Sequence, residues 1–205
     1  MAESAAMLHD VRDVERVFEA CFFASFRTRL EGGASEPLYL PSPAPAVRPH
    51  RILYREDFFA SALHEVAHWC VAGARRRRLE DYGYWYEPEG RSAARQAAFE
   101  SVESRPQAIE WAFAEACGRD FHPSADNLPA PLPALLPALL PVPLAAQREP
   151  DDGFLERIAA WRQRDREHGL PPRAEIFRRA LESLSEARRS AKESPPPRPP
   201  GSISS

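Results

Sequence analysis

The sequence predicts an α+β fold: one predominantly helical domain with a small sheet beside a helix that carries the pattern His64-Glu65-x-x-His68, as in metalloproteases. Apolar residues recur at intervals of three and four in several segments, which is the spacing of amphipathic helices. Two short apolar runs at 37–40 and 51–54 are typical of strands. The length of 205 residues gives room for one domain with a sizeable core.

The first predicted element is an amphipathic helix over residues 11–30. Its apolar stripe consists of Val14, Val17, Phe18, Cys21, Phe22 and Phe26. The Glu-Gly-Gly sequence at 31–33 is expected to end this helix, because glycine adopts the backbone conformation of a helix C-terminus. The runs at 37–40 and 51–54 follow. We expect them to pair because they are close in sequence.

The predicted metal-motif helix begins near Asp57, a residue type that caps helix N-termini. The apolar stripe of this helix is Phe59, Leu63, Val66 and Cys70. His64 and His68 lie beside this stripe, one turn apart on one face. The segment 73–78, which contains four consecutive arginines, is expected to lie beyond the end of the helix.

A further helix is predicted to begin at Ser104, with Ser104 as N-cap and Gln107 completing a capping box. Pro106 would then lie in the first turn, where proline is tolerated. The apolar stripe consists of Ile109, Ala112, Phe113 and Ala116. Gly118 is expected to end the helix, and Glu103 is expected to lie at its entrance.

Residues 1–128 are interpreted as the catalytic core and residues 129–149, rich in Pro, Ala and Leu, as a linker. Helices packed on the core are expected within 150–192, and a disordered tail at 193–205. The apolar positions of the last helices are Phe154, Ile158 and Trp161 in one and Phe177, Leu181 and Leu184 in the other.

Composition excludes several classes of protein. The formal net charge of −3 gives no basic field for nucleic acid, so no direct nucleic-acid partner is expected. The longest apolar tract, 128–146, carries six prolines and cannot form a regular membrane helix. Cys21, Cys70 and Cys117 are too few and too scattered for a disulfide framework. With an acidic N-terminus and no secretory signal, these features predict a cytoplasmic protein with no membrane partner.

Two histidines four residues apart on a helix can direct their ring nitrogens at one metal ion. In metalloproteases the glutamate after the first histidine, here Glu65, acts as general base on a metal-bound water. A catalytic metal usually has a third protein ligand. The acidic candidates are Glu100, Glu103, Glu110 and Glu115. A helix entrance favours Glu103, although the residues alone leave Glu100 and Glu110 open.

Two histidines and one carboxylate suit a zinc peptidase, and they equally suit a non-haem Fe(II) oxygenase that binds dioxygen. The motif alone favours the peptidase with zinc, and a binding module with a vestigial site is a third interpretation. The run Arg75–Arg78 has two interpretations, contact with an acidic patch on a partner protein and a solvated helix end, of which the second is simpler.

A longer resemblance decides between these classes. The segments HWCVAG, DYGYWY, FESVESRPQA and SADNL, with CFFASFRTRL and HRILYREDFFASALHE upstream, resemble the elongation factor P hydroxylase family over most of residues 11–128. The family hydroxylates the β-lysylated lysine of elongation factor P and is regarded as a non-haem metal oxygenase. The tract at 129–149 has no counterpart in this resemblance.

The resemblance implies a protein-lysine hydroxylase of the monooxygenase type, with Fe(II) as cofactor, dioxygen as co-substrate and elongation factor P as partner. It also implies that His64, His68 and Glu103 bind the metal, while Glu65 moves protons or orients a ligand. The expected substrate-binding residues are Tyr84, Trp85, Tyr86 and Glu110. The three aromatic rings suit a long cationic side chain, although core packing explains them equally well.

Overall fold

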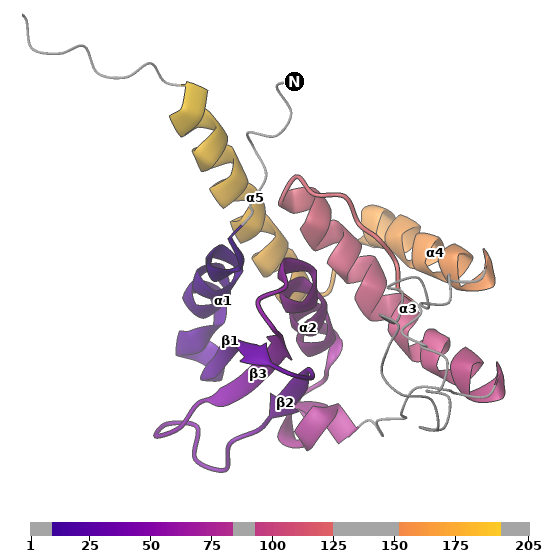
Figure 1. Ribbon diagram of the computed structural model, residues 1–205, viewed down its shortest axis with the longest axis horizontal. Coiled ribbons are helices and arrows are strands. Elements are labelled where there is room, and N and C mark those ends of the chain that lie inside the picture. The colour runs from indigo at the N-terminus through magenta and orange to yellow at the C-terminus, as the bar shows by residue number, and fades with distance from the viewer. Residues whose placement is uncertain (1–9, 84–92, 125–151, 194–205) are drawn as a thin grey trace, which may run out of the picture.

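The computed structural model describes residues 10–83, 93–124 and 152–193. A three-stranded sheet and five α-helices make up this part of the chain (Figure 1). Helix α1, Val11–Phe26, lies next to the sheet, and α2, Phe59–Val71, lies between the sheet and α3, Ala93–Ala116. Helix α4, Asp152–His168, packs on the far side of α3 from α2, and α5, Pro172–Glu193, contacts α1, α2 and α3. The predicted mostly helical fold with a small sheet is confirmed.

The sheet has the strand order β1-β3-β2. Strands β2, Leu38–Leu40, and β3, His50–Arg55, pair in antiparallel register, as their closeness in sequence predicted. Strand β1, Thr28–Ala34, pairs with β3 in parallel register. Short 3₁₀ turns η2, Arg76–Arg78, and η3, Glu80–Gly83, follow α2.

The prediction that one helix covers residues 11–30 was wrong at its C-terminal end. Helix α1 ends at Phe26 because Arg27 adopts a left-handed conformation with φ of 50°. The next residues form β1, where buried Thr28 and Leu30 alternate with exposed Arg29, a period of two that belongs to a strand. The glycines expected to end the helix therefore lie within β1 instead.

The predicted caps of the next two helices were also wrong. The N-cap of α2 is Phe58, which makes no side-chain cap hydrogen bond, so Asp57 does not cap this helix. Helix α3 begins well before Ser104 and runs through Pro106 without ending. Glu103 therefore lies in mid-helix and not at an entrance. The side chain of Gln107, which was predicted to complete a capping box, forms hydrogen bonds with the backbone of Ser124 instead.

The core is rich in aromatic residues, and it joins α1 and α5, the first and last helices that the structure describes. Phe18 and Phe22 of α1 and Phe177 of α5 are fully buried, and the ring centroids of the two α1 residues lie 5.2 and 4.9 Å from that of Trp69 on α2. The predicted stripes of α2 and α5 are buried or partly buried. Helix α2 is thus packed from several sides, which fixes the direction in which its polar face points.

The predicted domain boundaries stay predictions. The linker at 129–149 and nearly all of the tail at 193–205 lie outside the described residues. Gly118 has a φ of 71° just after α3, which agrees with its predicted role in ending that helix. None of the helices in the described ranges is both long enough and apolar enough to cross a membrane.

Candidate metal centre

Helices α2 and α3 bring three side chains together where they contact each other. His64 and His68 lie one turn apart on α2, and Glu103 lies on α3. The Nε2 atoms of the two histidines are 3.0 Å apart, and Oε2 of Glu103 lies 3.4 Å from that of His64 and 3.2 Å from that of His68. Among the described residues these form the one group of His, Cys, Asp and Glu side chains spaced to share a metal ion.

The spacing fits a metal ion. With metal–ligand bonds of about 2.0–2.1 Å, neighbouring ligand atoms lie about 2.9 Å apart in octahedral geometry and about 3.4 Å apart in tetrahedral geometry. The observed separations of 3.0, 3.2 and 3.4 Å fall within that interval. The side chains of His64, His68 and Glu103 are 20%, 14% and 9% exposed, so the site is shielded but reachable. Two histidines and a carboxylate leave positions for further ligands.

Glu110 occupies the other side of the His64 ring. Its Oε2 lies 2.8 Å from Nδ1 of His64. A carboxylate only accepts hydrogen bonds, so Nδ1 of His64 donates to Glu110. In the neutral ring Nε2, on the side of Glu103 and His68, is then the nitrogen whose lone pair a metal would bind. Carboxylate–histidine pairs of this kind orient metal-binding histidines in many proteins. The geometry separates Glu110 from the three atoms that converge on one point.

The charges of the cluster stabilise one another. Burial lowers the pKa of His64, but the carboxylates of Glu103 and Glu110 raise it more, to well above its usual value. Burial also lowers the pKa of His68, and Glu103 raises it above the usual value. Burial raises the pKa of Glu103, but the two histidines lower it well below the ordinary range. A cation at this point would replace the protons that the histidines carry.

Glu65 lies near a second group of polar side chains, which includes Asp81 and Tyr82. It is 8% exposed, and burial raises the pKa of its carboxyl group. Tyr82 lies near enough for the charge of Glu65 to raise its pKa, after the larger effect of burial. The Tyr82 hydroxyl has no hydrogen-bond partner in the described residues, and its ring stacks on Tyr39 at 4.5 Å. Asp81 and Tyr82 both have positive φ, a strained conformation often found at functional sites.

The predicted site residues have different outcomes. His64, His68 and Glu103 come together, although the reason given for Glu103, a helix entrance, was wrong. Glu100 contacts Arg157 instead. The aromatic residues predicted to contact substrate, Tyr84, Trp85 and Tyr86, lie outside the described residues.

Sequence reasoning missed two features of the site. The contact between Glu110 and His64 was not foreseen, although Glu110 lies seven residues after Glu103 and therefore on the same face of a continuous helix. The buried Tyr82 was overlooked beside the three aromatic residues that follow it. Its burial depends on stacking against a distant strand residue, Tyr39, which leaves no local signal.

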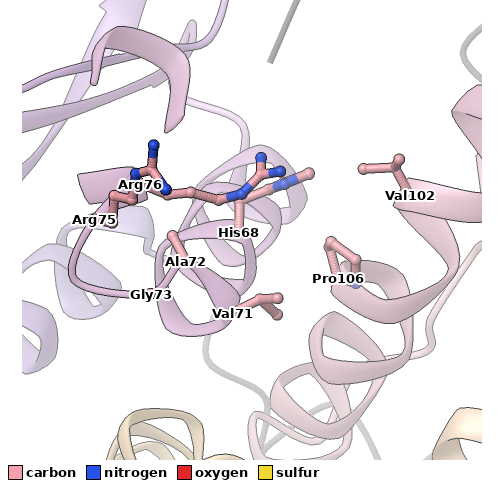
Figure 2. Close-up of a pocket in the computed structure, with 8 residues that line it drawn as sticks. All are labelled: His68, Val71, Ala72, Gly73, Arg75, Arg76, Val102 and Pro106. Carbon is pink, nitrogen blue, oxygen red and sulfur yellow. The ribbon is translucent and has the colours of Figure 1, made fainter. Parts of the chain in front are cut away.

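A cavity of about 340 Å³ opens beside the cluster. Figure 2 shows His68 and Val71 on α2, Arg75 and Arg76 on the segment after it, and Val102 and Pro106 facing them from α3. His68, a residue of the candidate metal centre, therefore forms part of the lining of this cavity.

Comparisons with known proteins identify the family of this chain. The sequence model of the family described as elongation factor P hydroxylase matches residues 17–136, more than half of the chain. The chain is also 43% identical over 177 residues to a protein of Haemophilus influenzae named elongation factor P lysine hydroxylase. That similarity covers 85% of this chain and 89% of the relative. The chain therefore belongs to the elongation factor P hydroxylase family.

Proposed function

We propose that this protein hydroxylates the β-lysylated lysine of elongation factor P at a metal centre formed by His64, His68 and Glu103. The observation that carries the proposal is the convergence of these three side chains in a member of this family. The relative's name supplies the substrate, a lysine of elongation factor P. The comparisons give the peptidase alternative no support. Because the substrate is a translation factor, the proposed location is the cytoplasm.

The three ligand atoms would hold Fe(II), and Glu110 would keep His64 in the tautomer that presents Nε2. Bound Fe(II) supplies the oxygen chemistry, with dioxygen as co-substrate, that no side chain provides alone. The chain itself positions the histidines on a rigid helix. Packing of α2 against the core limits how far the ligand atoms can move.

Glu65 is proposed to hold or move a proton at its carboxyl group. Burial raises the pKa of this group, which makes the protonated form more accessible than it is in water. Its neighbour Tyr82 offers a hydroxyl that has no partner in the described residues and is available to a bound group. Tyr84, Trp85 and Tyr86 remain the proposed walls of a slot for the long cationic side chain.

The reaction can be tested with purified protein, Fe(II), a reductant and β-lysylated elongation factor P. Mass spectrometry should show that the modified peptide gains one oxygen atom in air and none under nitrogen. The His68→Ala variant should give no gain, whereas Glu100→Gln, on a carboxylate outside the cluster, should keep the activity. An equal gain under both atmospheres would exclude oxygen chemistry. Cleavage of the substrate with zinc, and no gain in air, would restore the peptidase interpretation.

A further inference from the structure

The cavity beside His68 is lined mainly by apolar residues and arginines, whereas the neighbouring cluster consists of histidines and a glutamate. Its volume of about 340 Å³ is near the lower end for small-molecule sites, so it accommodates one or two side chains. It lies between the C-terminal end of α2 and the middle of α3, and it is open to solvent through exposed residues on both helices (Figure 2).

The floor of the cavity is apolar, and its two valines are exposed. Val71 on α2 and Val102 on α3 are each 38% exposed, and Pro106 lies one turn after Val102. These are two of the seven large apolar side chains that are exposed in the described ranges, and here they line one cavity. Apolar side chains that face solvent beside a site are typical of a surface that a partner covers.

The rim of the cavity is cationic. The side chain of Arg75 is exposed and has no ion-pair or hydrogen-bond partner among the residues that the structure describes. Arg76 is exposed on the same rim, and its guanidinium donates to the carbonyl of Tyr82 at 3.4 Å. Elsewhere, arginines of α4 and α5 such as Arg162 and Arg188 contact carboxylates of this chain. The positive charge of Arg75 is left for a group outside the described chain.

The sign of this charge decides what the cavity can accept. The side chain proposed to react is a cation, and Arg75 and Arg76 would repel it. The cavity therefore does not suit the modified lysine itself. A carboxylate suits it, because guanidinium binds carboxylates with two parallel hydrogen bonds. An apolar floor with an arginine rim is also the usual composition of a protein–protein contact.

We propose that the surface formed by Val71, Arg75, Arg76, Val102 and Pro106 docks an acidic segment of the protein that carries the modified lysine. The inference rests on the proposed function, since that function supplies a protein substrate. Docking on this surface would hold the substrate protein next to His68, while the cationic side chain enters the metal centre from another direction. The alternative, in which Arg75 lies only at a solvated helix end, predicts that reversing its charge has no effect.

The test compares two substrates: intact β-lysylated elongation factor P and a short peptide that carries the same modified lysine and no acidic residue. The Arg75→Glu variant should raise KM for the intact protein by about tenfold, with kcat nearly unchanged, because rim charges act on association. It should leave KM for the peptide and the metal content unchanged. Arg75→Lys should stay close to wild type, and Arg189→Glu, a reversal at an exposed arginine of α5, serves as the matched control.

Each outcome has a consequence. Equal KM values for Arg75→Glu and Arg189→Glu would overturn the proposal. An equal rise in KM for both substrates would also overturn it, since the cavity would then bind a small anion or take part in the reaction. If the wild type hydroxylates neither substrate, the proposed function has failed, and calorimetric titration of the intact protein into wild type and Arg75→Glu still tests docking. A circular dichroism spectrum that matches wild type, together with the same results for Arg75→Gln, separates a binding defect from misfolding.

Discussion

Two neighbouring faces of α3 both carry glutamates, but these glutamates contact different kinds of residue. On the face toward α2, the carboxylates of Glu103 and Glu110 contact His68 and His64. Seven residues correspond to nearly two full turns, so these two carboxylates point within about 20° of each other. Each meets an imidazole, which is a base with a lone pair and can become a metal ligand.

On the face toward α4, the carboxylates meet arginines. Glu100 contacts Arg157 at 2.9 Å, and Glu115 contacts Arg162 and Arg166. Arginine remains charged at physiological pH and has no lone pair to offer, so these pairs are neutralised and cannot hold a metal. The comparison teaches that the partner helix, and not the glutamate, decides whether an acidic residue of α3 belongs to the candidate site or to the packing.

The largest expected effect is on the α2 face. Glu103→Gln removes the one carboxylate whose oxygen converges with both Nε2 atoms, so the affinity for a divalent ion should fall by at least about 100-fold. Metal analysis after dialysis, with calorimetric titration, measures this. The matched control is Glu100→Gln, which should retain one ion per chain. Loss of metal from the control and not from Glu103→Gln would break the comparison.

The second effect is on the stability of the α4 face. Arg105 contacts Asp165 at 2.6 Å, and the Asp165 side chain is 2% exposed. Arg105→Met leaves that carboxylate buried without this cation, so the free energy of unfolding should fall by about 3 kcal/mol. Urea denaturation gives the value. The double variant Arg105→Met with Asp165→Leu should recover much of it, and both should bind metal as wild type does. A metal defect in either would show that the two faces are coupled.

The third effect sharpens the role of Glu110. Glu110→Ala should weaken metal binding by about 10- to 100-fold, because Nδ1 of His64 loses the acceptor that fixes its tautomer and orientation. Glu110→Gln keeps an acceptor oxygen and should lose less. Competition with a chelator of known affinity measures both. A loss for Glu110→Gln as large as that for Glu103→Gln would instead make Glu110 a ligand.

The smallest expected effect is the pH dependence of the free energy of unfolding. It is small because burial lowers the pKa values of the histidines while the carboxylates raise them. The pKa of His64 in the folded, metal-free protein lies above its unfolded value. The stability that this protonated group contributes is complete below the unfolded pKa of about 6.5 and is lost as the pH rises through the folded value. Urea denaturation with a chelator present should therefore give a lower free energy of unfolding at about pH 9 than at about pH 6.

The arginine pairs of the α4 face should contribute no such dependence, because arginine stays charged over this range. Glu110→Gln should reduce the pH dependence, since it removes one of the carboxylates that raise the pKa of His64. Bound metal should abolish this loss of stability at high pH, because the histidines must be deprotonated to bind it. A flat profile for the metal-free wild type would contradict the electrostatic description of the cluster.

Part of the fold was predictable from local pattern. The stripes of α2, α4 and α5 and the pairing of β2 with β3 follow from residues close in sequence, because apolar periodicity depends on a single element. Strand β1 and the first half of α3 were missed. Strand β1 pairs in parallel with a strand about 20 residues later, and the first half of α3 buries the polar Gln96 and Glu100.

By itself, the sequence determined that His64 and His68 share one face of an apolar helix and that the chain resembles one hydroxylase family. Only the tertiary structure decided which glutamate meets them. Ser104 and Pro106 suggested a helix start, but contacts with α2 and α4 hold α3 as one continuous helix through both. Local preferences of this kind amount to about 1–3 kcal/mol and yield to the burial of a whole helix face.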